Sequence, residues 1–157
     1  MVFSQSIARG MSVFTRDIQV GGNAYNEEIQ KRLGLNNEDA EKVKLGGTLD
    51  DVSAEEVTSI LDDATETLTQ EVQRSIDFFS ATSSDEKVQK AYITGGVSMV
   101  TSVRESLANR LGVPVEILDP WRQISFSEKE FDPEYLQSVG PVFSVAAGLA
   151  MRRMGDK

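Results

Sequence analysis

Two glycines that follow an apolar run form the first segment of the sequence with residue types suited to ligand binding. Val88 and residues 91–93 predict a buried strand, and Gly95 and Gly96 come directly after it. Glycine has no Cβ, so a flat group can lie against its backbone, and it can adopt positive φ angles. Ser98 is expected to cap a following helix whose apolar face comprises Val100, Val103, Leu107 and Leu111. The pattern predicts a pocket for a flat or polar ligand at the carboxyl edge of a sheet, with a turn that binds nothing as the alternative.

A carboxylate and an ammonium three residues apart form the second such segment. Glu41 and Lys44 lie on one face of a predicted helix. A carboxylate can accept hydrogen bonds from two neighbouring hydroxyl groups, as on a ribose, and a lysine stem can lie along a flat base. The alternative is a solvated surface pair of the kind that is common on helices.

The elements before the second segment would hold it in place. Residues 1–7 and 11–18 predict two strands that turn at Gly10, and only partial alternation in the second strand indicates one solvated face. Gly21, Gly22 and Asn23 interrupt the strand, and a helix follows from Ala24 to Leu33. Asn36 is expected to cap a helix over residues 38–45, which carries Glu41 and Lys44.

A long amphipathic helix is expected next, followed by the elements around the glycines. Ser53 and Glu56 have the spacing of a capping box, and apolar residues then recur every three or four positions to about Phe79. This stripe is interpreted as core, with a partner surface as the alternative. After a polar loop over residues 81–86 and the glycine segment, the chain predicts a helix to about Arg110 and a short strand over residues 113–118.

The last part of the chain contains the single tryptophan and a helix of small residues. Trp121 follows a turn and is interpreted as a plug of the core or an interface residue, with a ligand contact as the alternative. Asp132 and Pro133 form a helix start, and a final helix is expected over residues 141–153.

Composition limits the classes of function. The 157 residues carry a formal net charge of −9, with a pI of about 4.5. This charge disfavours binding to nucleic acid or to an anionic membrane surface. The chain has neither Cys nor His, so it offers no thiolate chemistry and lacks the commonest general base and metal ligand. No apolar run reaches the length of a membrane span, which makes a cytoplasmic location the default expectation.

The order of these motifs resembles the second half of an actin-like ATPase. The resemblance is closer to the family of the type IV pilus assembly protein PilM and covers essentially the whole chain. It is carried by residues 13–23, residues 39–44, residues 93–98 and the ending at residues 145–153. In such proteins the strand with its glycine turn is the adenosine motif, and the Glu-x-x-Lys helix faces it. The resemblance therefore implies ATP contacts at Glu41, Lys44, Gly95, Gly96, Val97 and Ser98, and places Gly21 and Gly22 in a loop near the nucleotide.

The resemblance also implies a fold, a cofactor and a partner. The expected fold is α/β, the second domain of an actin-like, ribonuclease H-like ATPase, over residues 1–157. It would contain a mixed sheet flanked by helices and a small helical insertion lobe at about residues 36–81. The sequence has no Asp-x-Gly hairpin, so the chain should not hydrolyse ATP alone, and Mg²⁺ would be held in the full-length parent.

The partner implied is the inner-membrane pilus protein PilN, whose groove lies in the other half of the family fold, so the location would be cytoplasmic and peripheral to the inner membrane. Exposed half-cleft surfaces could also self-associate. The alternatives are a cytoskeletal scaffold of the bacterial division-protein type, in which ATP is structural, and an acidic interaction domain without a ligand.

Overall fold

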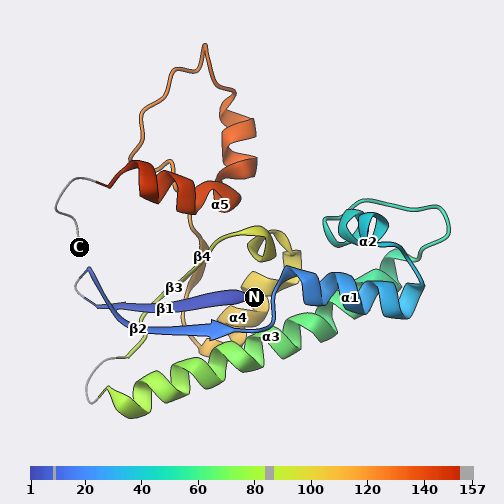
Figure 1. The fold of residues 1–157 in the computed structure, drawn as a ribbon, viewed down its shortest axis with the longest axis horizontal. Helices are drawn as coiled ribbons and strands as arrows, with labels where there is room; N and C mark the ends of the chain where they lie inside the picture. Colours follow the sequence, from blue (N-terminus) through green and yellow to red (C-terminus); the bar gives the residue numbers. More distant parts are fainter. Residues whose placement is uncertain (9, 84–86, 153–157) are drawn as a thin grey trace.

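The computed structural model describes residues 1–8, 10–83 and 87–152 (Figure 1). Two strands come first, three helices follow, and short strands and helices then alternate to the end of the described chain, as expected for a protein with both α and β elements. The elements are β1 (Val2–Ala8), β2 (Met11–Ile18), α1 (Gly22–Leu33), α2 (Asn37–Lys44), α3 (Ala54–Thr82), β3 (Ala91–Ile93), the 3₁₀ turn η1 (Gly96–Met99), α4 (Thr101–Leu111), β4 (Val115–Ile117) and α5 (Pro133–Ala150).

The described strands pair in twos. β1 and β2 form an antiparallel hairpin whose register shifts between Ser6 and Ile7, and β3 lies parallel to β4. The hairpin and its turn at Gly10, where φ is +77°, agree with the sequence prediction. One face of the hairpin is solvated, as the partial alternation indicated. Figure 1 shows α3 running alongside both pairs of strands.

The strand before the glycines is shorter and less buried than its composition predicts. β3 contains only three residues, and Val88 precedes it. Ala91 and Ile93 pack against the core, but Tyr92 lies on the opposite face, exposed, with the Lys90 ammonium over its ring. The prediction of a buried interior strand is therefore wrong for Tyr92, because successive side chains of a strand point to opposite faces.

The long helix α3 is present, although its predicted cap is not. The helix begins directly after Ser53, but the Ser53 side chain makes no capping hydrogen bond, so the capping box does not form. At its other end the helix continues past Phe79 to Thr82, so the connection begins later than predicted, and β3 does not start until Ala91. Residues 84–86 of the predicted loop lie outside the described part. The predicted apolar stripe is buried and not a partner surface, as shown by Val57, Ile60, Ala64, Leu68 and Phe79.

The helix α3 spans two apolar clusters. The larger contains Leu68 and lies among α1, α3 and α4, and the smaller contains Ile60 and lies among α1, α2 and α3. Leu61 packs against both clusters. Tyr25 is fully buried in the larger cluster, where its hydroxyl lies 3.1 Å from the hydroxyl of Thr65. The two clusters fix α1 relative to α2 and α4, which carry or adjoin the predicted site.

The final helix is longer than predicted and contains a proline. Asp132 caps α5 through the Glu134 amide, as expected, and the last helix, predicted to start at Pro141, is continuous with the helix that starts at Pro133. Figure 1 shows that α5 consists of two segments that meet at an angle. A proline inside a helix removes one hydrogen bond and bends the axis. Arg153, the predicted end of this helix, lies outside the described residues. None of the described helices combines the length and the apolar character that a membrane crossing requires.

Candidate functional site

The glycine turn is held in a conformation that only glycine adopts readily. Gly95 has φ +80° and ψ −179°, a region essentially restricted to glycine. Its amide donates to the Pro141 carbonyl at 2.8 Å, and the Thr94 hydroxyl donates to the same oxygen at 2.7 Å. Two hydrogen bonds to the bend in α5 therefore hold the glycine turn in place.

Ser98 supports the turn from within and does not cap the next helix. It belongs to η1, and its hydroxyl donates to the Gly95 carbonyl at 2.7 Å. Helix α4 begins later, at Thr101, after Val100. The prediction that Ser98 caps this helix is wrong, because the chain first makes a 3₁₀ turn that uses the serine hydroxyl. The predicted apolar face of α4 is nevertheless correct for Val100, Val103 and Leu107, which are buried.

Gly96 leaves a bare stretch of backbone at the surface. A Cβ atom placed on Gly96 would meet no other heavy atom within 4 Å, and the φ angle of this residue is not positive. Neither packing nor backbone conformation therefore explains a glycine at this position. A ligand that lies flat against the backbone is a sufficient reason.

Glu41 and Lys44 form an ion pair on α2, and the lysine is almost completely buried. Asn36 fixes the start of this helix by accepting a hydrogen bond from the Asp39 amide. Lys44 Nζ donates to Glu41 Oε2 at 2.5 Å, with 7% of the lysine side chain and 46% of the glutamate side chain exposed. This is not the solvated surface pair that the sequence left open. A buried ammonium has three N–H donors, and the described residues supply an acceptor for one.

Asn26 is a member of the cluster that the sequence analysis missed. It lies on α1, is 3% exposed, and donates from Nδ2 to Glu41 Oε2 at 2.7 Å. Its carboxamide oxygen is buried and has no hydrogen-bond partner in the described part of the chain. A signal was present in the sequence: Asn26 precedes Ile29 by three residues, so this polar side chain lies on the buried face of its helix.

These contacts leave one Glu41 oxygen available. Oε2 accepts from both Lys44 and Asn26, while no donor reaches Oε1 from the described residues. The Lys44 hydrogen bond, followed by the Asn26 hydrogen bond, lowers the pKa of Glu41 below its ordinary value. The carboxylate is thus ionised and oriented, and its Oε1 can accept a hydrogen bond from a hydroxyl group.

The two predicted segments meet at Gly22. A Cβ atom placed on Gly22 would lie 3.7 Å from Lys44 Nζ and 3.8 Å from Val97 Cγ2. The Glu-x-x-Lys helix and the glycine turn, more than fifty residues apart in the sequence, therefore approach each other at the first residue of α1. Gly21 lies instead against the backbone of Met1, where a Cβ atom would be 2.2 Å from the Met1 nitrogen.

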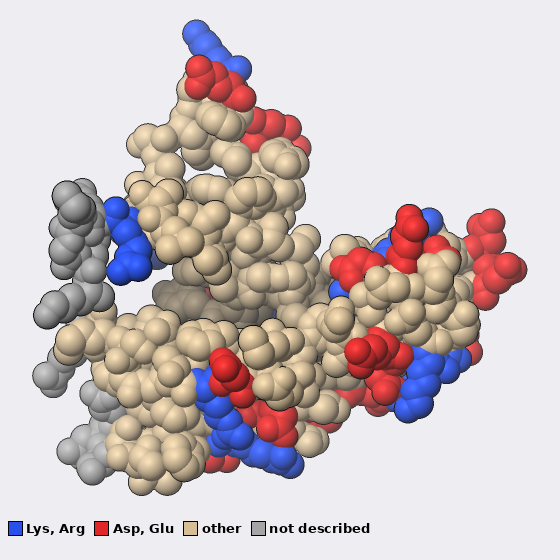
Figure 2. All heavy atoms as spheres, in the orientation of Figure 1, with Lys and Arg blue, Asp and Glu red and all other residues tan. Residues whose placement is uncertain are grey.

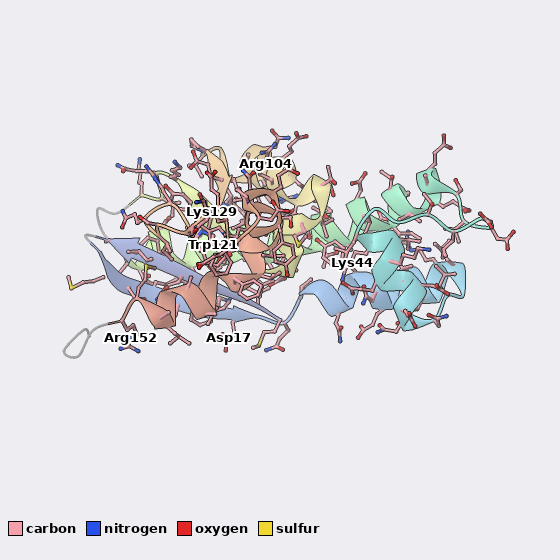
Figure 3. The ribbon with its side chains drawn as sticks, turned by 90° about the horizontal axis from the view of Figure 1, so that it is seen from above. Asp17, Lys44, Arg104, Trp121, Lys129 and Arg152 are labelled. Carbon is pink, nitrogen blue, oxygen red and sulfur yellow. The ribbon has the colours of Figure 1, made fainter. Side chains whose placement is uncertain are left out.

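The views of the molecule agree with this arrangement. Figure 2 shows a notch in the molecular surface between the part over α2 and the part over α5, and Figure 1 shows η1 at the base of this notch. Figure 3 shows Lys44 where the α1–α2 part meets the rest of the molecule. Bare backbone, an oriented carboxylate and a buried ammonium are together suited to a flat ligand that carries hydroxyl groups.

Comparisons with known proteins identify relatives of most of the chain. The sequence model of a family described as type IV pilus assembly protein PilM matches residues 3–154. A solved PilM–PilN type IV pilus biogenesis complex contains a chain that is 30% identical, with a TM-score of 0.79 over 90% of this chain and 39% of that one. The ethanolamine utilization protein EutJ from Carboxydothermus hydrogenoformans is 19% identical, with a TM-score of 0.64 over 95% of this chain and 44% of that one. The chain thus spans less than half the length of each relative, and the likeness supports the actin-like fold.

Proposed function

Because the chain belongs to the family of the type IV pilus assembly protein PilM, we propose that it binds the adenosine end of ATP. In this role it is the nucleotide-binding half of an actin-like protein that serves pilus assembly. The observation that carries the proposal is the approach of Lys44 and Val97 at Gly22, with the bare backbone of Gly96 next to Val97.

The residues of the cluster have distinct roles in this proposal. The backbone at Gly95 and Gly96 lies against the flat face of the base, and Glu41 Oε1 accepts a ribose hydroxyl. Lys44 orients Glu41 and offers its remaining N–H donors to the ligand. Ser98 maintains the turn through its bond to Gly95, and Val97 and Gly22 line the space between the two segments. Gly21 contributes the extended entry to α1.

The proposed role is binding without hydrolysis by this chain alone. Phosphoryl transfer depends on a clamp of backbone amides, basic side chains or Mg²⁺ around the phosphates. The sequence contains no Asp-x-Gly hairpin of the kind that provides this clamp in actin-like ATPases. In our proposal the phosphates and Mg²⁺ are held by the rest of a longer protein.

We further propose that residues 1–157 form the second half of that protein. Support comes from the coverage of 39% and 44% of the two relatives, and from the apolar outer face of the β1–β2 hairpin. Phe3 and Ile7 lie exposed on this face, and Met11 and Val13 are further exposed apolar residues of the hairpin. Residues 36–81 act as an insertion lobe over the nucleotide side, supported by the smaller apolar cluster that contains Ile60, to which α1 also contributes Ile29.

A PilN-like membrane protein is the proposed partner of the longer protein. The support is the solved complex of PilM with PilN, whose matching chain is 30% identical to this one. The groove for this partner is assigned to the other half of the fold. The protein would be cytoplasmic and reach the inner membrane through its partner.

A fluorescent ATP analogue tests the nucleotide site directly. Titration into the full protein is expected to show saturable binding that weakens at least tenfold in a Glu41→Ala, Lys44→Ala double variant. The matched control is Glu38→Ala with Lys42→Ala, which removes the same two charges from the exposed face of the same helix. Unchanged affinity in the first variant, or equal loss in the control, would contradict the assignment of the site.

A further inference from the structure

A hollow lined by aromatic side chains lies against α5, the helix whose Pro141 carbonyl also supports the glycine turn. It has a volume of about 570 Å³ and is formed by the chain between β4 and α5 together with the first half of α5. Five of the eleven aromatic residues in the sequence line it. They are Trp121, Phe126, Phe131, Tyr135 and Phe143.

The floor of the hollow is fixed, while its walls stay accessible. Trp121 donates its ring N–H to the Leu136 carbonyl at 2.7 Å, and its ring centre lies 6.3 Å from that of Phe143. Tyr135 is 60% exposed and Phe131 51% exposed, although both line the hollow. Because the tryptophan N–H is already bonded, the hollow presents mainly apolar surface to an incoming group.

Glu130 lines the hollow, and the segment around it carries more acidic than basic side chains. Glu128, Glu130, Asp132 and Glu134 are all exposed, and none forms an ion pair with another described residue. Over residues 119–139 the sequence has five acidic residues against two basic ones. Figure 2 shows acidic atoms on the projecting loop and the start of α5, with basic atoms at the tip of the loop.

We propose that this hollow docks a peptide segment of a partner protein that carries a large apolar anchor beside Lys or Arg. An apolar, aromatic-lined pocket favours an aliphatic or aromatic anchor, and Glu130 with the excess of exposed carboxylates around it favours cations at the edge. A second copy of the chain is a poorer occupant, because it would bring the same excess of carboxylates and its own net charge of −9. Figure 3 separates Trp121 from Lys44, so the hollow is distinct from the nucleotide site.

Two labelled peptides test the proposal. Both contain the same Leu and Phe anchors; one has Lys and Arg at the flanking positions and the other has Glu. Fluorescence anisotropy of the label is measured with the full chain, together with the emission of Trp121, the only tryptophan of the sequence. We expect saturable binding of the basic peptide, a change in Trp121 emission, and at least tenfold weaker binding of the acidic peptide.

Variants distinguish docking from general attraction. Phe131→Ala and Glu130→Lys should each lower the affinity for the basic peptide at least fivefold. Glu56→Lys, an exposed change at the start of α3, should change this affinity by less than twofold. Circular dichroism verifies that each variant is folded, and binding of the ATP analogue verifies the other site independently.

Three results would overturn the proposal. The first is equal binding of the two peptides, and the second is the absence of saturable binding. The third is a concentration-dependent dimer that dissociates in Phe131→Ala, since a second copy of the chain would then be the occupant.

Discussion

At the scale of single residues, Asn26 determines how Glu41 is presented. Its carboxamide reaches across from α1 and bonds the same glutamate oxygen as Lys44. An ion pair within one helix would leave the carboxylate free to change rotamer, but a third group from a second helix restricts it. Asn26 is a positioning residue in this sense, because it acts on the proposed ligand through Glu41.

Replacement of Asn26 should weaken nucleotide binding with a moderate loss of stability. Asn26→Ala removes a hydrogen bond to a charged group, so we expect a loss of about 1–3 kcal/mol in unfolding free energy and an affinity loss of roughly tenfold. Titration of the fluorescent ATP analogue and urea unfolding measure the two effects. Asn23→Ala, an exposed change on the same helix, is the control. An Asn26→Ala variant with normal affinity would refute the positioning role.

The pH dependence of Glu41 follows from the same contacts. Since Lys44 and Asn26 lower its pKa in the folded state, the Glu41 contacts stabilise the fold above the ordinary glutamate range. This stabilisation is lost only as the pH falls through the lowered folded-state pKa. NMR titration of the Glu41 side-chain carboxyl should show a midpoint below about 4.3, the reference value. The midpoint should rise in Asn26→Ala and further in Lys44→Met; an identical midpoint in all three proteins would exclude the proposed cause.

The two neighbouring glycines should respond differently to substitution. Gly96→Ala has room for its methyl group and no positive φ, so unfolding free energy should change by less than about 0.5 kcal/mol. Affinity for the nucleotide should nevertheless fall at least tenfold, because the methyl group occupies the face on which the base lies. Gly95→Ala should instead cost about 1–3 kcal/mol of stability, because alanine is strained at its backbone angles. Normal nucleotide affinity in Gly96→Ala would contradict the adenosine site.

At the scale of elements, α5 joins the two candidate sites. The Pro141 carbonyl accepts hydrogen bonds from the Thr94 hydroxyl and the Gly95 amide. Gly140, the preceding residue, allows Trp121 to approach the same helix closely. The α5 axis bends at Pro141, and the carbonyl of that residue faces the glycine turn. One helix therefore supports the glycine turn and the aromatic hollow together.

Two glycines of α5 offer a matched test of this packing. A Cβ atom on Gly140 would lie 3.0 Å from Trp121 Nε1 and 3.3 Å from Pro120 Cδ, whereas one on Gly148 would meet nothing within 4 Å. Gly140→Ala should therefore lower the unfolding free energy by about 1–3 kcal/mol. Gly148→Ala should raise it by about 0.5–1 kcal/mol, because alanine favours the helix. Thermal unfolding with Trp121 fluorescence measures both, and equal effects would show that Trp121 does not pack closely on α5.

At the scale of the whole molecule, the apolar outer face of the hairpin lacks a partner within the described chain. Phe3 and Ile7 point away from the core, while the inner face brings Phe14 within 5.7 Å and 5.9 Å, between ring centres, of Phe79 and Phe78. An exposed sheet face with large apolar side chains is typical of an interface. In the proposed longer protein, the other half would cover it.

The position of Phe3 in this face makes the proposal measurable. In the 157-residue chain, Phe3→Ala should change unfolding free energy by less than about 0.5 kcal/mol and should reduce self-association in sedimentation experiments. In the longer protein the same change should cost about 3–5 kcal/mol if the face is buried there. Phe14→Ala, on the inner face, should destabilise both proteins. A loss in the short chain as large as that of Phe14→Ala would contradict an uncovered face.

The sequence by itself determined the features that depend on neighbouring residues. The caps at Asn36 and Asp132, the hairpin turn at Gly10 and the stripe of α3 all follow from local hydrogen bonding and periodicity. The pairing of Glu41 with Lys44 belongs to this group, because their spacing of three residues is fixed by the helix. The order of these motifs also indicated the family that the comparisons found.

Only the tertiary structure decided which of these groups meet and how deeply they are buried. The contact of Asn26 with Glu41, the burial of Lys44 and the approach of Val97 to Gly22 join residues from separate elements. Ser53 and Ser98 had suitable types for caps but made none, since the surrounding chain offered other geometry or another acceptor. Local propensity indicates that an element is present and which of its faces is apolar. Its exact ends and the environment of its side chains depend on packing between distant segments, which spacing in the sequence does not encode.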